Sequence, residues 1–338
     1  MGNGIHVAIA GATGAVGQEL LSVLKRRKFP VRELTLLASA RSAGKHIEFS
    51  GQTLTVKELG KDSFDGVDLA LFSAGGNCSR EFAPHAVDAG AVVVDNSSAF
   101  RMDPEVPLVV PEVNPETVQG HRGIIANPNC STIAMVVPLS PLHRAFGVKR
   151  VTVATYQAAS GAGALAMEEL REETRAQLAG QAYERKLFPV QYAFNLFPHD
   201  SAMLDNGYCE EEIKMVRETQ KILDDDSIAI SATCIRVPVL RAHSEALNIE
   251  FVHDVTPEQA YEVLSAAPGV EIFEDREKNR WATPADVSGR DPVLVGRLRK
   301  NISQPNTLDL WLVSDQLLKG AALNAVQIAE LLSANGTG

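Results

Sequence analysis

The fold of this chain is decided near its start by the stretch Ile5-His6-Val7-Ala8-Ile9-Ala10-Gly11-Ala12-Thr13-Gly14-Ala15-Val16-Gly17. A largely apolar run with strand character ends at Ala10, three glycines follow in GxxGxxG spacing, and a helical pattern continues to Arg27. Strand, glycine-rich turn and helix open a dinucleotide-binding βαβ unit, in which the backbone approaches a pyrophosphate at the helix N-terminus. A tight turn that binds no ligand is the alternative.

The second expected strand, 34–38, ends in Ser39-Ala40-Arg41-Ser42. Units that bind NAD usually have an acidic residue here for the ribose hydroxyls, whereas this chain has hydroxyls and an arginine. That set suits a 2′-phosphate and favours NADP, because a guanidinium binds phosphate well. Alternatively, Arg41 is a solvated surface residue.

Alternating strands and helices continue to residue 126. We expect strands at 67–73, 91–95, 108–110 and 123–126 and a helix at 79–89. The loop after 91–95 ends in Arg101, which is suited to hold a phosphate or carboxylate. Such loops leave the carboxyl ends of parallel strands, where open α/β sheets bind their ligands.

The next stretch, Asn127-Pro128-Asn129-Cys130-Ser131-Thr132, places a cysteine where a loop turns into a helix. Pro128 cannot lie inside a helix and Asn129 is a good N-cap, so Cys130 falls in the first helical turn. The helix dipole there stabilises a thiolate, which is a nucleophile. Alternatively, Cys130 is a small buried apolar residue.

Beyond residue 147 the pattern changes to long strands and amphipathic helices, which predicts a mostly antiparallel sheet with helices on one side. Expected strands are 148–159, 227–239, 246–252, 293–300 and 307–313; expected helices are 130–146, 164–178, 209–223, 256–265 and 315–334. The segment 181–206 is aromatic and has no regular pattern. It is either a dimer arm or a cover for the core.

Composition narrows the class of protein. A length of 338 residues allows two domains, and 45% hydrophobic with 22% charged residues is typical of a globular protein. No apolar run approaches a membrane span, and we expect no secretion signal. The net charge of −10 argues against non-specific nucleic-acid binding. The four cysteines are widely spaced, so we expect reduced thiols in the cytoplasm.

A cysteine nucleophile needs a partner for proton chemistry. Among eight histidines, His243 is the most suggestive, because it follows the strand that carries Arg236. An imidazole suits general acid–base work near neutral pH. A structural or surface histidine is the alternative.

Five blocks together identify a family. They are Gly11–Gly17, Ser97-Ser98-Ala99-Phe100-Arg101, Asn127–Thr132, Tyr156-Gln157-Ala158-Ala159-Ser160-Gly161 and Arg236-Val237-Pro238-Val239 with His243-Ser244. In this order, over nearly the whole chain, they resemble bacterial aspartate-semialdehyde dehydrogenases. N-acetyl-glutamyl-phosphate reductases and glyceraldehyde-3-phosphate dehydrogenases use similar chemistry, but the sequence around their cysteine differs.

The resemblance implies that 4-phospho-L-aspartate and NADPH interconvert with L-aspartate 4-semialdehyde, NADP⁺ and phosphate through a cysteine thioester. In the family this reduction feeds lysine, threonine, methionine and isoleucine synthesis. The alternatives are an N-acetyl-glutamyl-phosphate reductase and an NADP-binding sensor with an inert cysteine.

The resemblance also implies roles for individual residues. Cys130 is the nucleophile, His243 the acid–base catalyst, and Gln157 orients the intermediate. The implied substrate and phosphate contacts are Arg101, Asn129, Gln157, Glu211, Lys214 and Arg236, with Arg236 on the carboxylate and Glu211 on the amino group. The expected cofactor contacts are Gly11, Thr13, Gly14, Ala15, Val16, Ser39, Arg41, Ser42, Ser160, Gly161 and Gln316. We expect no metal.

The predicted fold is therefore α/β, with two domains. A Rossmann-type NADP-binding domain spans 1–127 and is completed by a C-terminal helix within 315–338. An α+β catalytic and dimerisation domain spans 128–314, and we expect a homodimer.

Overall fold

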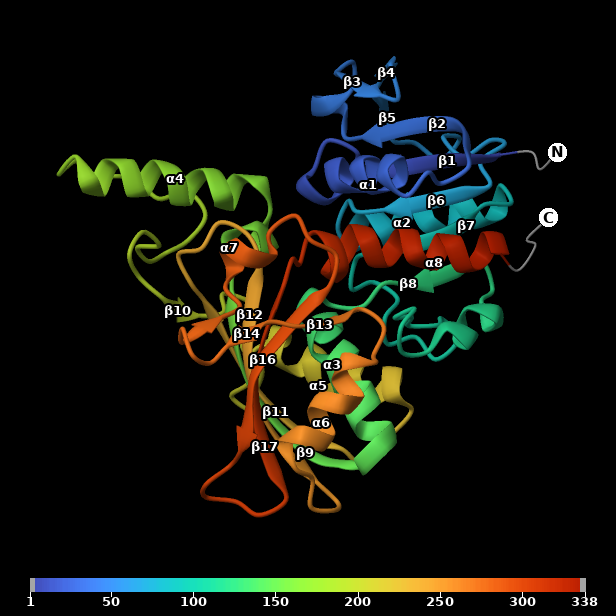
Figure 1. Cartoon of the computed structure of the whole chain (residues 1–338). Helices are drawn as coiled ribbons and strands as arrows, with labels where there is room; N and C mark the ends of the chain where they lie inside the picture. Colours follow the sequence, from blue (N-terminus) through green and yellow to red (C-terminus); the bar gives the residue numbers. More distant parts are fainter. Residues whose placement is uncertain (1–3, 335–338) are drawn as a thin grey trace. The chain divides into compact units, whose positions relative to one another are not determined.

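A computed structural model describes residues 4–334. These residues form two compact units, one of residues 4–129 with 321–334 and one of residues 130–320 (Figure 1). Residues 1–3 and 335–338, which the predicted first domain includes, lie outside the described residues.

The first unit contains a six-stranded parallel sheet in the order β5-β2-β1-β6-β7-β8. Its strands are β1 (Ile5–Ala10), β2 (Val31–Ala38), β5 (Lys57–Glu58), β6 (Leu69–Phe72), β7 (Val92–Asp95) and β8 (Ile124–Ala126). Strand order reverses beside β1, which has β2 on one side and β6 on the other. This topological switch point is where doubly wound sheets bind dinucleotides. The predicted Rossmann-type fold is confirmed.

Helices cover both faces of this sheet. Ala83 and Ala86 of α2 (Gly76–Asp88) pack against Ala8 and Phe72. Strand residues that alternate with Ala8 and Phe72 point to the opposite face of the sheet. On that face, α1 (Ala15–Arg26) contacts β1. The C-terminal helix α8 (Leu323–Ala334) contacts α1 and β7 in the same unit, as its red ribbon beside the blue elements shows (Figure 1).

Several details of the first unit differ from prediction. Strand β2 and helix α2 each begin three residues earlier than expected, and β5 was not predicted. Residues 108–110 form no strand; a single parallel bridge joins Leu108 to Ala126. A hairpin of β3 (His46–Phe49) and β4 (Gln52–Thr55) was not predicted. Its strands alternate exposed and half-buried side chains, so they have little apolar periodicity to reveal them. A short 3-10 helix, η2 (Pro115–Gly120), precedes β8.

The second unit contains a seven-stranded sheet in the order β10-β11-β9-β12-β17-β16-β13. Its strands are β9 (Val148–Gln157), β10 (Phe197–Pro198), β11 (Ala229–Arg236), β12 (His243–Phe251), β13 (Val270–Ile272), β16 (Val293–Lys300) and β17 (Thr307–Ser314). Only the β11–β9 and β13–β16 pairs are parallel, which confirms the mostly antiparallel sheet.

Most of the helices of this unit lie along the sheet. They are α3 (Cys130–Phe146), α4 (Ala164–Leu178), α5 (Glu210–Leu223), α6 (Pro257–Ser265) and α7 (Pro284–Val287), with the 3-10 turn η3 (Ala159–Ala162). Helices α3, α5 and α6 each contact sheet strands. Thr256 caps α6, where its hydroxyl accepts a hydrogen bond from the Gln259 N–H. Helices α3 to α6 agree with prediction to within one residue.

Three boundaries in this half were predicted wrongly. Strand β11 stops at Arg236, and β12 already begins at His243. The last helix does not start at Asp315, because that buried carboxylate accepts hydrogen bonds from the Arg241 side chain and the Gly289 N–H. A π-helical turn, η4 (Leu318–Ala322), comes before α8. The small hairpin β14 (Glu274–Asp275) and β15 (Arg280–Trp281) was not predicted.

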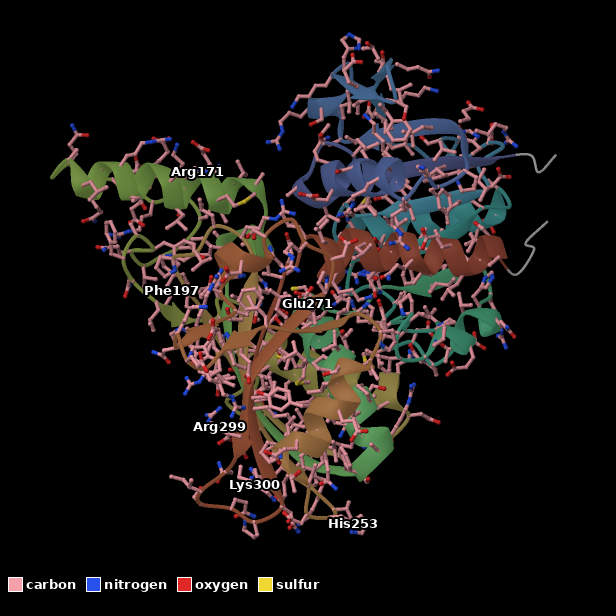
Figure 2. The ribbon with its side chains drawn as sticks, in the orientation of Figure 1. Arg171, Phe197, His253, Glu271, Arg299 and Lys300 are labelled. Carbon is pink, nitrogen blue, oxygen red and sulfur yellow. The ribbon has the colours of Figure 1, made fainter. Side chains whose placement is uncertain are left out.

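The aromatic segment 181–206 packs on α4. Phe188, Tyr192 and Phe197 form an aromatic cluster, with ring centroids 5.0–5.5 Å apart, against Leu170 of α4. Buried Glu169 accepts hydrogen bonds from the backbone N–H groups of 186–188, and Glu173 accepts them from those of 192–193. Figure 2 marks Arg171 on α4 and Phe197 on β10. One side of the segment therefore covers a core.

Candidate functional site

The glycine turn of the first unit fits a dinucleotide. Gly11 has φ +91°, and a β-carbon there would lie 2.2 Å from the Ser73 carbonyl oxygen at the end of β6. A β-carbon at Gly17 would lie 2.3 Å from the Gly11 carbonyl. Only glycine allows this close packing of the turn, β6 and α1. The turn lies at the switch point, and no acidic residue stands in the first turn of α1, so its N–H groups can donate hydrogen bonds to a pyrophosphate.

The end of β2 lies beside the same turn, because the Gly11 and Ala12 N–H groups donate to the Leu37 carbonyl at 2.8 and 3.1 Å. This places Ser39–Ser42 next to the predicted cofactor contacts Thr13 to Val16. Arg41 is exposed, whereas Ser42 is buried. The exposed guanidinium is free to meet a ligand at this edge.

The Arg101 side chain is buried, and backbone carbonyl groups hold its guanidinium. Its Nε donates to the Asn127 carbonyl at 2.9 Å and its Nη2 to the Asn96 carbonyl at 2.8 Å, at the ends of β8 and β7. The Asn127 amide is fixed in turn by Asn96 and by Asn324 of α8. Asn129, the other predicted substrate contact of this unit, is also buried.

Cys130 is the first residue of α3, as predicted, and is partly exposed. The main chain of Gly320 packs closely against Cys130, since a β-carbon at Gly320 would lie 2.7 Å from the Cys130 β-carbon. All four cysteines are free thiols. Burial and nearby carboxylates raise the pKa of the Cys78 thiol, and burial strongly raises the pKa of Cys234. Cys78 is also partly exposed and lies in the first turn of α2, but its raised pKa disfavours a thiolate there.

Sheet register brings three of the predicted residues to one end of the second unit. Gln157 ends β9 and lies opposite Arg236, which ends β11. Strand β12 runs antiparallel to β9, so its first residue, His243, lies at the same end, paired with Ser314 of β17. All three side chains are at most 4% exposed.

Glu211 joins Gln157 to Lys214. The Gln157 Nε2 donates to Glu211 Oε1 at 3.2 Å, and Lys214 Nζ lies 3.4 Å from Glu211 Oε2. The structure also distinguishes Glu211 from its neighbours. Glu212 caps α5 through the Cys209 N–H and bonds the Cys234 N–H, while Glu210 is exposed. Of the three glutamates, only Glu211 faces the predicted site.

Arg236 is paired on one side and open on the other. Its Nε lies 3.0 Å from Asp200 Oδ1, whereas its buried Nη1 has no hydrogen-bond partner among residues 4–334. Asp200 was not predicted, because it lies in the irregular aromatic segment, where no pattern marks it. Ser201 accepts the Glu211 N–H at 3.1 Å, so this segment supports two site residues.

His243 is fixed by its backbone surroundings. Its Nδ1 accepts a hydrogen bond from the Ala158 N–H at 3.0 Å. Burial and the Arg236 guanidinium lower the pKa of the imidazole to about 3. Its Nε2 is buried and has no partner in the described part of the chain.

A glycine leaves space where these groups converge. A β-carbon at Gly161 would lie 3.0 Å from His243 Nε2 and 3.2 Å from Arg236 Nη1. Two buried nitrogens that have no partner in the described part of the chain therefore border one small space, which suits an anionic or carbonyl oxygen.

Gln316 and Ser160, both predicted cofactor contacts, are bonded to each other through the Gln316 amide and the Ser160 hydroxyl. The Gln316 Oε1 also accepts the Ala242 N–H at 2.9 Å. Ala242 has φ +76°, in the left-handed region that is strained for alanine, immediately before His243. The sequence did not predict that Gln316 would hold the backbone next to His243.

Two negative findings concern residues 4–334. No group of three or more His, Cys, Asp or Glu side chains there is arranged to hold a metal ion. None of the helices in that range has both the length and the apolar content needed to cross a bilayer.

Known proteins resemble the chain over nearly its full length. Residues 6–121 match the family model described as the semialdehyde dehydrogenase NAD-binding domain, and 139–319 match the semialdehyde dehydrogenase dimerisation domain. The aspartate-semialdehyde dehydrogenase of Synechocystis is 58% identical over 98% of both chains.

Two solved structures add to this. Aspartate-semialdehyde dehydrogenase II of Vibrio cholerae, crystallised in complex with ASA, is 48% identical, with a TM-score of 0.96 over 99% of both chains. The aspartate-semialdehyde dehydrogenase of Candida albicans, determined with NADP, is 25% identical, with a TM-score of 0.74 over 98% of both chains.

Proposed function

This chain belongs to the aspartate-semialdehyde dehydrogenase family of oxidoreductases, and we propose that it reduces 4-phospho-L-aspartate to L-aspartate 4-semialdehyde, reversibly and with release of phosphate. The product serves lysine, threonine, methionine and isoleucine synthesis. The observation that carries the proposal is a pair of buried nitrogens, Arg236 Nη1 and His243 Nε2, that have no hydrogen-bond partner among residues 4–334 and lie at the sheet end that also holds Gln157.

Charge supports this substrate, which carries a carboxylate, an ammonium and a phosphoryl group. Arg236 presents a guanidinium that can bind the carboxylate, and Glu211 presents a carboxylate for the ammonium. We assign the phosphoryl group to Arg101 and Lys214. Local cations thus allow a chain of net charge −10 to bind an anionic ligand.

Cys130 begins the chemistry as a thiolate, which the N-terminus of α3 favours. The sulfur attacks the acyl carbon, the C–O bond to phosphate breaks, and a thioester remains on Cys130. When bound, the reduced dinucleotide supplies a hydride to that carbon. The C–S bond then breaks, which releases the aldehyde and restores the thiolate. Gln157 lies beside Glu211 and is suited to orient the acyl group.

We propose NADP as the dinucleotide. The glycine turn, the N-terminus of α1 and exposed Arg41 are suited to the pyrophosphate and to a 2′-phosphate. The Candida albicans relative was determined with NADP. Ser39, Ser42, Ser160, Gly161 and Gln316 remain proposed contacts.

The decisive assay follows the reverse reaction. The purified protein is mixed with aspartate semialdehyde, phosphate and NADP⁺, and NADPH absorbance is recorded. We expect phosphate-dependent NADPH formation that Cys130→Ser abolishes and Cys78→Ser, a second partly exposed cysteine, retains. If NADPH forms with N-acetyl-glutamate semialdehyde and not with aspartate semialdehyde, the protein is an N-acetyl-glutamyl-phosphate reductase. Full activity of Cys130→Ser would refute the thioester.

We also propose that the chain forms a homodimer through the second unit. Of the 12 exposed large apolar side chains in residues 4–334, eight lie between 165 and 204. They are Leu165, Leu178, Leu187, Val190, Phe194, Leu196, Met203 and Leu204. Such clustering is typical of an interface, and the family model that covers this region is described as a dimerisation domain.

Sedimentation velocity tests the dimer. Phe194→Asp with Leu196→Asp should shift the protein from dimer to monomer, since each side chain is at least 60% exposed and would bring a charge into the interface. Ile302→Asp, at an exposed apolar residue outside the cluster, should remain dimeric. A monomeric wild type would refute the assignment.

The free cysteines lead us to propose a cytoplasmic location.

A further inference from the structure

We propose that Asn324, the second residue of α8, is a positioning residue that sets the direction of the Arg101 guanidinium for phosphate. It acts through a chain of asparagine amides that joins the two residues whose carbonyl groups hold Arg101. This inference rests on the proposed function, because that function assigns the phosphoryl group to Arg101. All of these residues belong to the first unit.

Three asparagine side chains are bonded head to tail at the carboxyl edge of the parallel sheet. Asn324 Nδ2 donates to Asn127 Oδ1 at 2.6 Å, and Asn127 Nδ2 donates to Asn96 Oδ1 at 3.0 Å. Asn96 Nδ2 then donates to the carbonyl of Phe72, the last residue of β6, at 2.8 Å. Asn96 follows β7 and Asn127 follows β8, so the chain of amides runs from α8 across the ends of three strands.

Backbone carbonyl groups fix the orientation of these amides. A carbonyl oxygen only accepts hydrogen bonds, so the Asn96 nitrogen must face Phe72 and its oxygen must face Asn127. Asn324 Nδ2 also donates to the Val109 carbonyl at 3.0 Å, so the same nitrogen serves the Asn127 oxygen. Asn127 is only 1% exposed, and solvent therefore cannot replace the Asn324 donor if it is lost.

Arg101 is attached to the main chain of the same two asparagines. Its Nε donates to the Asn127 carbonyl and its Nη2 to the Asn96 carbonyl, at 2.9 and 2.8 Å. Two bonds from one planar guanidinium define the plane of that group. Pro128, which follows Asn127, has no N–H that could hold this peptide group. The side-chain amides therefore help to set the two carbonyl groups on which the plane of Arg101 depends.

The loop that carries Arg101 has a separate support. The buried Asp95 carboxylate accepts hydrogen bonds from Ser79 Oγ at 2.7 Å, from the Ser97 N–H at 3.0 Å and from Ser97 Oγ at 2.6 Å. None of these bonds involves Asn324. Loss of the Asn324 amide should therefore leave the loop folded and change the direction in which Arg101 presents its guanidinium.

Such a change should affect phosphate more than the other reactants. Hydrogen bonds between a guanidinium and a phosphate are directional and are often paired, so a turned guanidinium binds phosphate more weakly. The proposed thioester chemistry on Cys130 and the proposed dinucleotide contacts use other residues. The expected signature is a higher KM for phosphate with little change in kcat.

Steady-state kinetics of Asn324→Leu measure this signature. Leucine has nearly the shape of asparagine and no donor. We expect KM for phosphate to rise about tenfold, while kcat and KM for NADP⁺ stay within about threefold of wild type. The matched control is Gln327→Leu, which removes a different α8 side-chain bond, from Gln327 Nε2 to Glu112 at 2.9 Å, and should keep the wild-type KM. An unchanged KM for phosphate in Asn324→Leu would overturn the inference.

A double-mutant cycle shows whether the effect passes through Arg101. In Arg101→Lys a single ammonium cannot span both carbonyl groups. Asn324→Leu should therefore raise KM for phosphate in the wild-type background and have no further effect in the Arg101→Lys background. Equal rises in the two backgrounds would refute the positioning role. Asn324→Asp, which keeps the shape and replaces the donor nitrogen by oxygen, gives the same comparison if the leucine variant does not fold.

A measurement without turnover separates this inference from the function on which it rests. Bound phosphate raises the melting temperature, and we expect a smaller rise for Asn324→Leu than for Gln327→Leu. If the wild type forms no NADPH from aspartate semialdehyde and phosphate, the proposed function fails, while this comparison still tests Asn324. If the wild type is active and phosphate stabilises both variants equally, only the positioning role fails.

Discussion

The main chain of Gly320 lies against the β-carbon of Cys130, so closely that a β-carbon at residue 320 would approach it to 2.7 Å. Real β-carbons do not make such contacts, so a side chain at 320 must displace Cys130. A residue 190 positions away in the sequence (320 − 130) therefore sets the place of the nucleophile.

Gly320→Ala should accordingly inactivate the protein. A displacement of about 1 Å at a reacting atom can lower kcat about 10²-fold. The steady-state assay measures this, and thermal unfolding shows whether the variant folds. The matched control is Gly120→Ala, since Gly120 is exposed and a β-carbon there meets nothing within 4 Å. Wild-type kcat in Gly320→Ala would show that the contact does not position Cys130.

Asp200 should affect substrate binding more than catalysis. Its carboxylate holds Arg236 Nε at 3.0 Å and leaves Nη1 for the substrate. In Asp200→Asn we expect KM for aspartate semialdehyde to rise about tenfold with kcat changed less than about threefold, because a neutral amide oxygen holds the Arg236 guanidinium more weakly than a carboxylate does. Asp205→Asn, an exposed aspartate in the same segment, is the control. A fall in kcat at unchanged KM would contradict this role.

Glu211 should be the one glutamate of its cluster that matters for turnover. Its carboxylate contacts Gln157 and Lys214, so Glu211→Gln removes a charge that orders both. We expect kcat/KM to fall roughly 10–100-fold. Glu210→Gln, at the exposed neighbour, should leave kcat/KM unchanged. Similar kinetics for the two variants would reject the assignment of Glu211.

Glu245 should make the protein less stable as pH rises. Burial raises the pKa of this carboxyl well above its usual value, and neither oxygen has a partner among the described residues. Above the unfolded-state pKa the unfolded chain loses this proton while the folded chain keeps it, so stability falls as pH rises, up to the folded-state pKa.

Glu245→Gln removes this pH dependence, because glutamine does not ionise. We compare the free energy of unfolding of the variant with that of the wild type at pH 4 and at pH 8. The variant should gain stability relative to the wild type over this range, by about 1.4 kcal/mol for each unit by which the folded-state pKa of Glu245 exceeds its unfolded-state pKa. Urea unfolding at both pH values measures it. A difference that does not change with pH would mean that Glu245 is ionised in the folded protein.

Arg41 should govern the choice of dinucleotide. Arg41→Ala removes the exposed guanidinium at the end of β2, so the preference for NADP⁺ over NAD⁺ in kcat/KM should narrow about tenfold. Lys61→Ala, at another exposed cation of the first unit, is the control. Equal use of both dinucleotides by the wild type would refute the 2′-phosphate assignment.

Much of the fold follows from short-range pattern. The strand–glycine–helix opening, the helix that begins at Cys130 and the bounds of α4 were predictable, because apolar periodicity and caps involve residues a few positions apart. The 46–55 hairpin was not, since its strands bury almost nothing. The start of the last helix was misplaced because Asp315 is committed to distant partners.

The sequence by itself determined which residue types the site contains: a cysteine at a helix start, an arginine and a histidine near strand ends, and glutamine, glutamate and lysine for the substrate. Tertiary structure alone decided how they act. The Ala158 N–H bonds His243 across 85 residues, and Gln157 bonds Glu211 across 54. Sheet register makes these contacts, and no local pattern encodes register between strands so far apart. For that reason the histidine could be chosen from the sequence, but its hydrogen-bond partner could not.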